Sequence, residues 1–419
     1  MRAMEPLRIG LFTDDFFPAS GGIGRSLQVQ LARLQQAGHD VTLFAPHSHF
    51  TPPETGKYVK LPCLRLPGTP SYLCTLFANP VLARQMAEQY PLDVIHTQNE
   101  RGAYYLGAML STLLGVPQVH TFHTNFAGSH ESNPAGAGIV SIAYLQGLSR
   151  LLIKAFTGGK AVKLRRNRLS NEDGPYDRPD FRALARFASH VAESTSPAAH
   201  IADAIVKSSG GALADRMSVI PNGVAEPFLK VRRKRPRGGI TRFISSGRLD
   251  AVKRVDAIID AYDQLGDDDT ELVIVGDGTL FSQLKRKAQT VRHGRVLFTG
   301  QISDLNRLAQ EVADADVFVL ASWHFDVQPM VLIEAAAAGT PILYCDERLT
   351  TGTSEENALL TSPDVSSLAR GMRELAADPA RRERMGAAGR RLSDTFTPQA
   401  MAGKYVEVYR RAIDRHQRK

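Results

Sequence analysis

The chain has 419 residues, of which 43% are hydrophobic and 22% charged, and it carries a net charge of +8 at pH 7. This length is too great for one ordinary hydrophobic core and predicts two or three domains. The three scattered cysteines exclude a cysteine metal motif and a disulfide framework. No uninterrupted apolar run approaches the ~20 residues of a membrane-spanning helix, and the first residues lack the cleavage site of a signal peptide. We therefore expect a cytoplasmic protein.

Positive charge gathers in two blocks. Five of the residues from Lys160 to Arg168 are basic, as are six of those from Lys230 to Arg237. Such blocks suit lipid head groups, nucleic acid or sugar-nucleotide phosphates, and they are also typical of solvated loops. We interpret the second block as a solvated interdomain linker, because proline and glycine accompany it. Nucleic-acid binding is the weaker interpretation, since few aromatic residues are interleaved with the cations.

The first half of the chain alternates apolar strands with helices. The predicted strands cover residues 7–13, 41–45, 93–96, 118–122, 191–194 and 217–221. A loop with Gly21, Gly22 and Gly24 follows the first strand and precedes a helix, so its backbone either approaches a ligand closely or makes a plain tight turn. Its spacing differs from the G-x-G-x-x-G fingerprint, which argues against an NAD-dependent oxidoreductase.

Two histidines lie at the end of the strand over residues 118–122. His120 and His123 are three positions apart, so their side chains face opposite ways in an extended strand. The carboxyl end of a parallel strand is where open α/β sheets bind ligands, and we therefore choose His123 as the site residue. We interpret His120 as a buried histidine with satisfied hydrogen bonds. The spacing of His and Cys residues suggests no metal site.

Residues 149–182 have the least clear secondary-structure pattern in the sequence. An apolar helix from Leu151 to Phe156 is followed by the first basic block and then by RLSNEDGPYDRPDF. Asn, Gly and Pro give this last segment the composition of a mobile loop. An apolar helix beside a basic block suits a membrane surface, but amphipathic helices more often pack against a core, and we favour the core.

The second half of the chain also alternates apolar strands with helices. Its predicted strands cover residues 241–245, 272–275, 296–298, 317–320 and 341–344, with helices between them. Strands that alternate with helices form parallel sheets with right-handed crossovers. We predict an α/β fold of two Rossmann-like domains, residues 1–226 and 227–396, with a cleft between them. The basic helix over residues 397–419 is expected to pack back on the first domain.

The stretch over residues 315–346 combines a buried strand, a polar loop, a helix of small residues and a second buried strand. Asp326 lies in the loop and Glu334 eight positions later in the helix, and Pro329 between them suits the first helical turn. A helix N-terminus attracts phosphates through its free N–H groups and its dipole. This pattern indicates a nucleotide-sugar site, although Asp326 taken alone also suits a solvated helix cap.

Several motifs resemble one enzyme family. In chain order, FPASGGIGRS, VIPNGV, SGRLDAVKRVD, VGDGTL, ADVFVLAS and VLIEAAAAGTPIL are similar to segments of the retaining glycosyltransferases of family GT4. The resemblance runs from residue 9 to residue 412, except for about residues 150–182. It implies the GT-B fold, with two facing Rossmann-like domains, the first for the acceptor and the second for a nucleotide sugar. It also implies a retaining hexosyltransferase with a UDP- or GDP-linked donor.

The resemblance carries over to particular residues. Asp326 and Glu334 match the family's E-x7-E element, in which the first acid contacts the donor sugar and the second the nucleotide ribose; the first acid here is Asp. Arg248 and Lys253 match its diphosphate-binding cations, and the charge of a leaving diphosphate independently calls for such cations. His123, expected near the donor sugar, is with Asp326 a catalytic candidate. The remaining donor-binding candidates are loop glycines and helix-start residues: Gly22, Gly247, Gly276, Val327, Gln328, Pro329 and Met330.

The resemblance leaves the substrates open. Two cations in place of a metal, without a suitable D-x-D loop, predict a reaction that needs no metal or other cofactor. The basic blocks and the apolar helix favour a glycolipid or cell-envelope glycan precursor as acceptor, at the inner face of an anionic membrane, and a soluble sugar or a phosphorylated polyol is also open. The family's Gly-Gly-x-Pro-Glu stretch is replaced by YCDERLTTGTSEENALL, which leaves the donor undetermined. A GT-B epimerase or phosphorylase is the alternative, and no nucleic-acid partner is expected.

Overall fold

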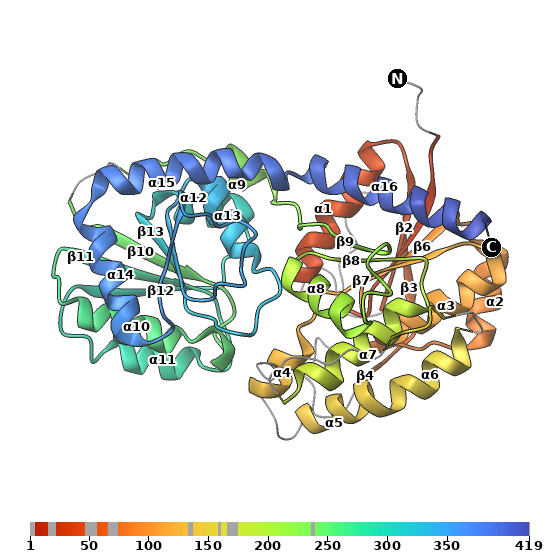
Figure 1. Cartoon of the computed structure of the whole chain (residues 1–419). Helices are drawn as coiled ribbons and strands as arrows, with labels where there is room; N and C mark the ends of the chain where they lie inside the picture. Colours follow the sequence, from red (N-terminus) through yellow and green to blue (C-terminus); the bar gives the residue numbers. More distant parts are fainter. Residues whose placement is uncertain are drawn as a thin grey trace. The chain divides into compact units, whose positions relative to one another are not determined.

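The computed structural model describes residues 5–15, 22–46, 57–65, 74–132, 137–157, 161–165, 175–235 and 239–418 (Figure 1). The chain divides into two compact units: unit 1 comprises residues 1–223 and 398–419, and unit 2 comprises residues 224–397. The division falls just before the boundary expected at residue 226, because Val224 and Phe228 belong to the hydrophobic core of unit 2.

Unit 1 is built on a parallel sheet. Within the described ranges, its strand order is β3-β2-β1-β6-β7-β8-β9, and each neighbouring pair is parallel. A short antiparallel pair of strands, β4 and β5, is separate from it. The strands are β1 (Arg8–Phe12), β2 (Asp40–Pro46), β3 (Lys57–Leu61), β4 (Cys63–Arg65), β5 (Cys74–Leu76), β6 (Val94–Thr97), β7 (Gln118–Thr121), β8 (Glu193–Ser196) and β9 (Met217–Val219).

Helices cover both faces of this sheet. Along β1, Ile9 and Leu11 join one core cluster with α1 and α16, whereas Phe12 joins a second cluster with α2 and α3. The C-terminal helix is also held by Arg415, whose Nε lies 2.9 Å from the carboxylate of the buried Glu193. The helices are α1 (Gly22–Gln36), α2 (Pro80–Gln89), α3 (Gly102–Leu114), α4 (Phe126–Ser132), α5 (Ala137–Ala143), the π-helical turn η1 (Tyr144–Leu148), α6 (Ser149–Phe156), α7 (Asp177–Ser189), α8 (Ala199–Ser208) and α16 (Pro398–Gln417).

Unit 2 has a second parallel sheet, with the order β12-β11-β10-β13-β14-β15 within the described ranges. Its strands are β10 (Thr241–Ser246), β11 (Thr270–Val275), β12 (Arg295–Gly300), β13 (Val317–Leu320), β14 (Ile342–Tyr344) and β15 (Ala358–Leu360). Its helices are α9 (Glu226–Lys230), the 3-10 turn η2 (Ala251–Lys253), α10 (Val255–Leu265), α11 (Phe281–Ala288), α12 (Leu305–Asp314), α13 (Met330–Ala338), α14 (Val365–Ala377), α15 (Pro379–Leu392) and the 3-10 turn η3 (Ser393–Phe396).

The strands of unit 2 are buried on both faces. Phe243 and Val317 belong to one core cluster, with α10 and α14, while the next residues, Ile244 and Phe318, belong to the cluster with α12 and α13. In Figure 1, α10, α11 and α14 lie on one side of the sheet and α9, α12, α13 and α15 on the other. Double burial explains why these strands appear in the sequence as continuous apolar runs.

The segment with the least clear sequence pattern, residues 149–182, contains the start of a helix that we did not predict. We expected a mobile loop as far as residue 181, but α7 begins at Asp177. Pro179 does not prevent the helix, because it lies in the first turn, where its missing N–H has no intrahelical partner. The core is built by Ala183, Leu184 and Phe187, all of them buried. Residues 168–174 of the predicted loop lie outside the described residues.

The second basic block is not a solvated linker. Arg233 and Arg235 both bind the Asp316 carboxylate, at 2.8 and 3.1 Å, and Lys230 pairs with Glu226 at 2.6 Å within α9. The backbone of the block is fixed as well, because Arg235 N–H donates to an Asp314 carboxylate oxygen at 2.8 Å. Much of the charge of this block is therefore compensated inside unit 2.

One long apolar helix runs over Gly138–Phe156, through α5, η1 and α6. Within the described ranges it alone has the length and mean hydropathy, 1.3, that would allow a helix to cross a membrane. Core helices of soluble proteins meet the same criteria, so the finding is weak evidence for a membrane span. Only 17% of this stretch is buried, however, which differs from the core helix that we favoured.

Candidate functional site

The strand order of each sheet defines one switch point. In unit 1 the chain leaves β1 for β2 on one side, and β6 pairs with β1 on the other. In unit 2 the chain leaves β10 for β11 on one side, and β13 pairs with β10 on the other. Open α/β sheets bind ligands beyond the carboxyl ends of the two strands at such a point. The loops after β1, β6, β10 and β13 are therefore the candidate site loops.

In unit 2 the switch point brings together two predicted site residues. Lys253 ends the turn η2 after β10, and Asp326 lies in the loop after β13; Lys253 Nζ is 2.6 Å from Asp326 Oδ1. The other carboxylate oxygen of Asp326 accepts a hydrogen bond from the Ser322 hydroxyl at 2.6 Å. Lys253 Nζ also lies 5.8 Å from the centre of the Phe325 ring. The acid is 9% exposed, so it is not the solvated helix cap that we considered.

Two arginines flank this ion pair. The side chain of Arg248, in the loop after β10, is about half exposed, and its Nη2 lies 3.1 Å from Asp250 Oδ2. Arg254 follows Lys253 in the left-handed conformation, with a φ of 50°. Its guanidinium donates to the carbonyl oxygens of Ala321, at 3.2 Å, and of Pro363, at 2.6 Å. Arg254 therefore connects η2 to the loop that carries Asp326, a structural role that sequence reasoning missed.

Helix α13 follows the Asp326 loop directly. It begins at Met330, with Pro329 as its N-cap and no side-chain cap hydrogen bond, so Pro329 lies one residue before the helical turn in which we expected it. Val327, Gln328 and Met330 are nearly buried at this helix start. Glu334 lies within α13 and is 2% exposed. The structure thus places Asp326 at the start of the helix that carries Glu334.

Two predicted donor-binding glycines touch each other. A Cβ on Gly276 would lie 1.9 Å from the Gly247 carbonyl oxygen, and Gly247 N–H donates to the Val275 carbonyl at 3.0 Å. Both glycines have a positive φ, of 140° and 150°. Glycine is required at Gly276 because the loops after β10 and β11 approach this closely. The geometry gives these glycines a packing role that fixes the loop carrying Arg248.

The predicted site of unit 1 is described only in part. Gly22 begins α1 and is exposed, while the preceding residues of its glycine loop lie outside the described residues. His123 follows β7, and its Nε2 lies 2.6 Å from Gln98 Oε1. Burial, assisted by the neighbouring His120, lowers the pKa of His123 to about 3, so this imidazole is neutral. His120 is fully buried, with Nδ1 2.8 Å from the Thr97 hydroxyl. Its Nε2 has no hydrogen-bond partner within the described residues, so our interpretation of a buried histidine with satisfied hydrogen bonds is only half right.

Sequence reasoning missed several polar residues at the switch point of unit 1. Asp14 follows β1 and is fully buried; its carboxylate accepts hydrogen bonds from the Leu76 N–H at 2.6 Å and from the Ala103 N–H at 3.0 Å. Burial raises the pKa of Asp14 to about 6. Asp15 pairs with Arg101 at 3.1 Å. Their position directly after the first strand was the available signal.

The loop after β13 holds two further missed residues. His324 has a φ of 58°, and its N–H donates to Asp346 Oδ2 at 2.8 Å. Trp323 is 45% exposed and stacks on His324, with the ring centres 4.0 Å apart. A non-glycine residue with positive φ beside an exposed aromatic ring is typical of a ligand-binding loop. The lone tryptophan of the sequence was a signal that could have identified this loop.

Two family models match the chain. The family described as "Glycosyltransferase Family 4" matches residues 20–226, and the family described as "Glycosyl transferases group 1" matches residues 230–392. The first match covers most of unit 1, and the second covers nearly all of unit 2. The second match includes the switch point of unit 2, whereas the first begins at residue 20, after strand β1 and the residues that directly follow it.

Individual proteins are similar to most of the chain. The alpha-monoglucosyldiacylglycerol synthase of Streptococcus pneumoniae is 26% identical over 356 residues, which cover 80% of this chain and 70% of that protein. The glycogen synthase of Mycobacterium tuberculosis is 26% identical over 427 residues, with 93% and 91% covered. The crystal structure of Anabaena Alr3699/HepE in complex with UDP superposes with a TM-score of 0.66 at 15% identity, over 96% of this chain and 99% of that chain. The structural match establishes the fold.

Proposed function

This chain belongs to the GT4-type glycosyltransferases and is a hexosyltransferase of the GT-B fold, and we propose that it moves a hexose from a UDP- or GDP-linked donor to a hydroxyl acceptor with retention of configuration. The observation that carries the proposal is the contact between Lys253 and Asp326 at the switch point of unit 2. It places a cation and a carboxylate together where α/β sheets bind their ligands.

Lys253 and Arg248 bind the donor diphosphate in this proposal. The Lys253 ammonium has three N–H donors. Within the described ranges, one of them forms a hydrogen bond to Asp326, and the others can bind phosphate oxygens. Arg248 is half exposed and offers a guanidinium that can bind two phosphate oxygens at once. Together the two cations stabilise the charge that develops on the leaving diphosphate, so the reaction needs no metal.

Asp326 and Glu334 recognise the rest of the donor. Asp326 holds Lys253 with one oxygen and Ser322 with the other, and a carboxylate retains lone pairs to accept hydrogen bonds from sugar hydroxyls. Glu334 binds the nucleotide ribose. Neutral His123, in unit 1, orients the sugar by a hydrogen bond rather than by charge, because its pKa is about 3.

The reaction has one bond to break and one to form. The bond between the anomeric carbon and the diphosphate oxygen breaks, and the acceptor oxygen bonds to the same face of the sugar. The proton of the acceptor hydroxyl passes to the leaving phosphate oxygen. This route requires no covalent enzyme intermediate.

We propose a glycolipid or a cell-envelope glycan precursor as acceptor, at the inner face of an anionic membrane. The exposed apolar helix over Gly138–Phe156 supports a lipid surface. The pneumococcal relative is named for a glucosylated diacylglycerol, which favours the same class of acceptor. Transfer from labelled donors to extracted lipids, with soluble sugars compared in parallel, tests this part of the proposal.

Donor binding can be measured through the protein itself. Trp323 is the only tryptophan of the chain, and it lies three residues before Asp326, so its fluorescence reports on the site without a label. A titration with UDP, GDP and ADP is expected to give a saturable change with one of them, and the bound nucleotide is expected to raise the melting temperature. The proposed donor site is wrong if none of the three nucleotides changes either signal.

A further inference from the structure

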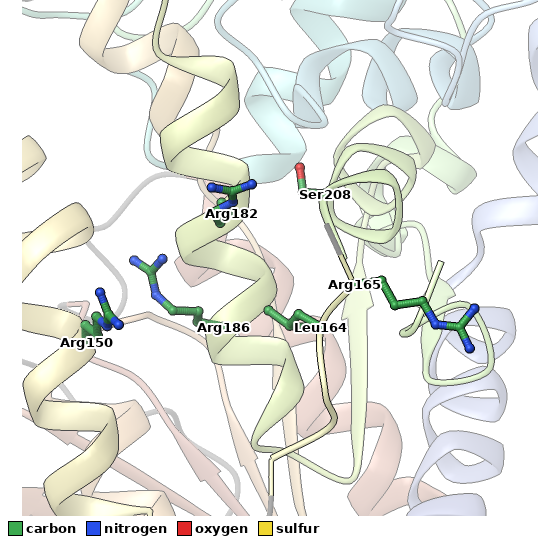
Figure 2. Close-up of a pocket in the computed structure, with 6 residues that line it drawn as sticks. All are labelled: Arg150, Leu164, Arg165, Arg182, Arg186 and Ser208. Atoms are coloured by element: carbon green, nitrogen blue, oxygen red, sulfur yellow. The ribbon is translucent and has the colours of Figure 1, made fainter. Parts of the chain in front are cut away.

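Unit 1 contains a pocket that the proposed function does not use. Its volume is about 270 Å³, close to the ~300 Å³ at which pockets for small ligands begin. Its lining is rich in arginine: Arg150, Leu164, Arg165, Arg182, Arg186 and Ser208. In Figure 2, Arg150 from α6 and Arg186 from α7 extend into the space between their helices, with Arg182 one turn away on α7, while the Arg165 side chain points away from them.

The charge of this pocket is not compensated. Within the described ranges, none of its four arginines forms an ion pair, in contrast to Arg233 and Arg235 of the second basic block. The Nε–H of Arg186 is buried and has no acceptor. Burial and the nearby charges of Arg150 and Arg182 lower the pKa of the Arg186 guanidinium below its ordinary value. A bound anion would reduce the repulsion between these three positive charges. It would also accept a hydrogen bond from the buried Nε–H.

Hydrogen bonds hold the backbone around the pocket. Asp180, in the first turn of α7, binds His130 of α4 at 2.7 Å and Gln146 of η1 at 2.8 Å, all through side chains. The segment with Leu164 and Arg165 is tied at both ends, since Val162 N–H donates to Ser189 and Arg165 N–H to Ser209, at 2.9 and 3.0 Å. The backbone that carries the arginines is therefore fixed before a ligand binds, which lowers the entropic cost of binding, whereas the Arg150 and Arg182 side chains are themselves exposed.

We propose that this pocket is a binding site for a phosphate group, separate from the donor-binding residues of unit 2. Guanidinium groups bind phosphate oxygens through paired, charge-assisted hydrogen bonds. Arg182 and Arg186 are four residues apart and so lie on one face of α7, and Arg150 meets them from α6. This arrangement offers several N–H donors to a tetrahedral anion and gives the buried Arg186 Nε–H an acceptor.

The surroundings favour a phosphate carried by a lipid. Ile139, Val140, Leu148 and Leu151 are each at least half exposed, and they lie on the same continuous helix as Arg150. Exposed apolar side chains beside a basic pocket suit an anionic lipid, whose chains and head group need both surfaces. A soluble phosphate ester shares the head-group chemistry alone, so the two sources can be separated by experiment.

The experiment uses the full-length protein and two kinds of vesicle. Both contain phosphatidylcholine, one with phosphatidate and the other with a carboxylate lipid, cholesteryl hemisuccinate, adjusted to the same surface charge. Binding is measured by co-sedimentation for wild type, Arg182→Gln, Arg186→Gln and Arg84→Gln. Arg84 is an exposed arginine on α2 of the same unit, so its variant removes the same charge away from the pocket. Titration with glycerol 3-phosphate tests the soluble source.

We expect wild type to bind the phosphatidate vesicles more tightly than the carboxylate vesicles. Arg182→Gln and Arg186→Gln are each expected to weaken this binding by about tenfold, since each removes charge-assisted hydrogen bonds, and Arg84→Gln by less than about twofold. Glycerol 3-phosphate binding that depends on the same two arginines also supports the site and identifies a soluble source. The Lys253→Ala variant, altered in unit 2, should bind phosphate as wild type does, which separates this site from the donor site.

Three results would overturn the proposal. One is equal binding of both vesicle types, which would indicate a general charge effect. The second is wild-type binding by both pocket variants with folded circular-dichroism spectra. The third is phosphate binding that is lost in Lys253→Ala and kept in the pocket variants.

Discussion

Lys253 and Asp326, 73 positions apart in the chain, form an ion pair with Nζ 2.6 Å from Oδ1. Both side chains are largely buried, and Ser322 holds the second oxygen of the acid. The two residues meet because their strands, β10 and β13, are neighbours at the switch point of the sheet. The cation and the acid that we assign to the donor site therefore position each other.

This relationship predicts energetic coupling. Lys253→Ala leaves a nearly buried carboxylate with Ser322 as its remaining partner, so it is expected to reduce the free energy of unfolding more than the double variant Lys253→Ala/Asp326→Asn does. A double-mutant cycle in urea should give a coupling of about 1–3 kcal/mol. The exposed pair Arg292–Asp263, at 2.9 Å, serves as control and should couple less strongly. Additive effects at Lys253 and Asp326 would contradict the pairing.

The contact between Gly276 and Gly247 predicts a steric effect. Gly276→Ala places a Cβ 1.9 Å from a carbonyl oxygen at a φ of 140°, and we expect the free energy of unfolding to fall by about 2–5 kcal/mol. Gly300→Ala is the matched control, because Gly300 has a φ of 70° and nothing within 4 Å of an added Cβ. Its loss should be about 1–2 kcal/mol. Equal losses in the two variants would exclude the clash.

Asp14 predicts a pH-dependent contribution to stability. Its pKa is about 6 in the folded protein, against an ordinary value of 3.8, because the carboxyl is buried. The folded chain thus keeps a proton that the unfolded chain releases, so this stabilisation is present below about pH 4 and is lost as the pH rises through about 6. Relative to Asp14→Asn, wild type should lose roughly 2.4 kcal/mol between about pH 4 and about pH 7. A constant difference would show that Asp14 does not titrate in this range.

The low pKa of His123 predicts that the effect of replacing it on kcat/KM does not depend on pH. Because its pKa is about 3, the imidazole stays neutral between about pH 5 and about pH 8. His123→Ala should lower kcat/KM about tenfold to a hundredfold, by removing the hydrogen bond that we propose to the donor sugar, and by the same factor at every pH in this range. A factor that changes strongly near pH 6.5 would mean that His123 titrates and acts through its charge.

The sequence predicted the architecture well, for identifiable physical reasons. Doubly buried strands such as β11 and β13 appear as uninterrupted apolar runs, and the linker composition around residue 227 lies close to the observed boundary. The expected family and GT-B fold are confirmed by the comparisons. Helix α7 was missed because Pro179 and its polar neighbours resemble a loop, whereas the buried face that stabilises the helix comes later, from Ala183 to Phe187.

The site was predictable only in part. Motif spacing identified Lys253 and Asp326 singly, but their contact depends on strand order, which no local pattern encodes. The same holds for Asp14 and Arg254, whose partners lie far away in the sequence. The arginine pocket combines residues from α6, α7 and the segment before α7, so the sequence revealed only its basic block.

The most direct test of the central claim is the release of nucleoside diphosphate from UDP- and GDP-hexoses, measured with an acceptor extract for wild type and Lys253→Ala. We expect acceptor-dependent release by wild type with one donor, and a loss of about a hundredfold or more in the variant, because the leaving diphosphate loses its buried cation. Release by Lys253→Ala at the wild-type rate, or none by wild type with any donor, would contradict the account.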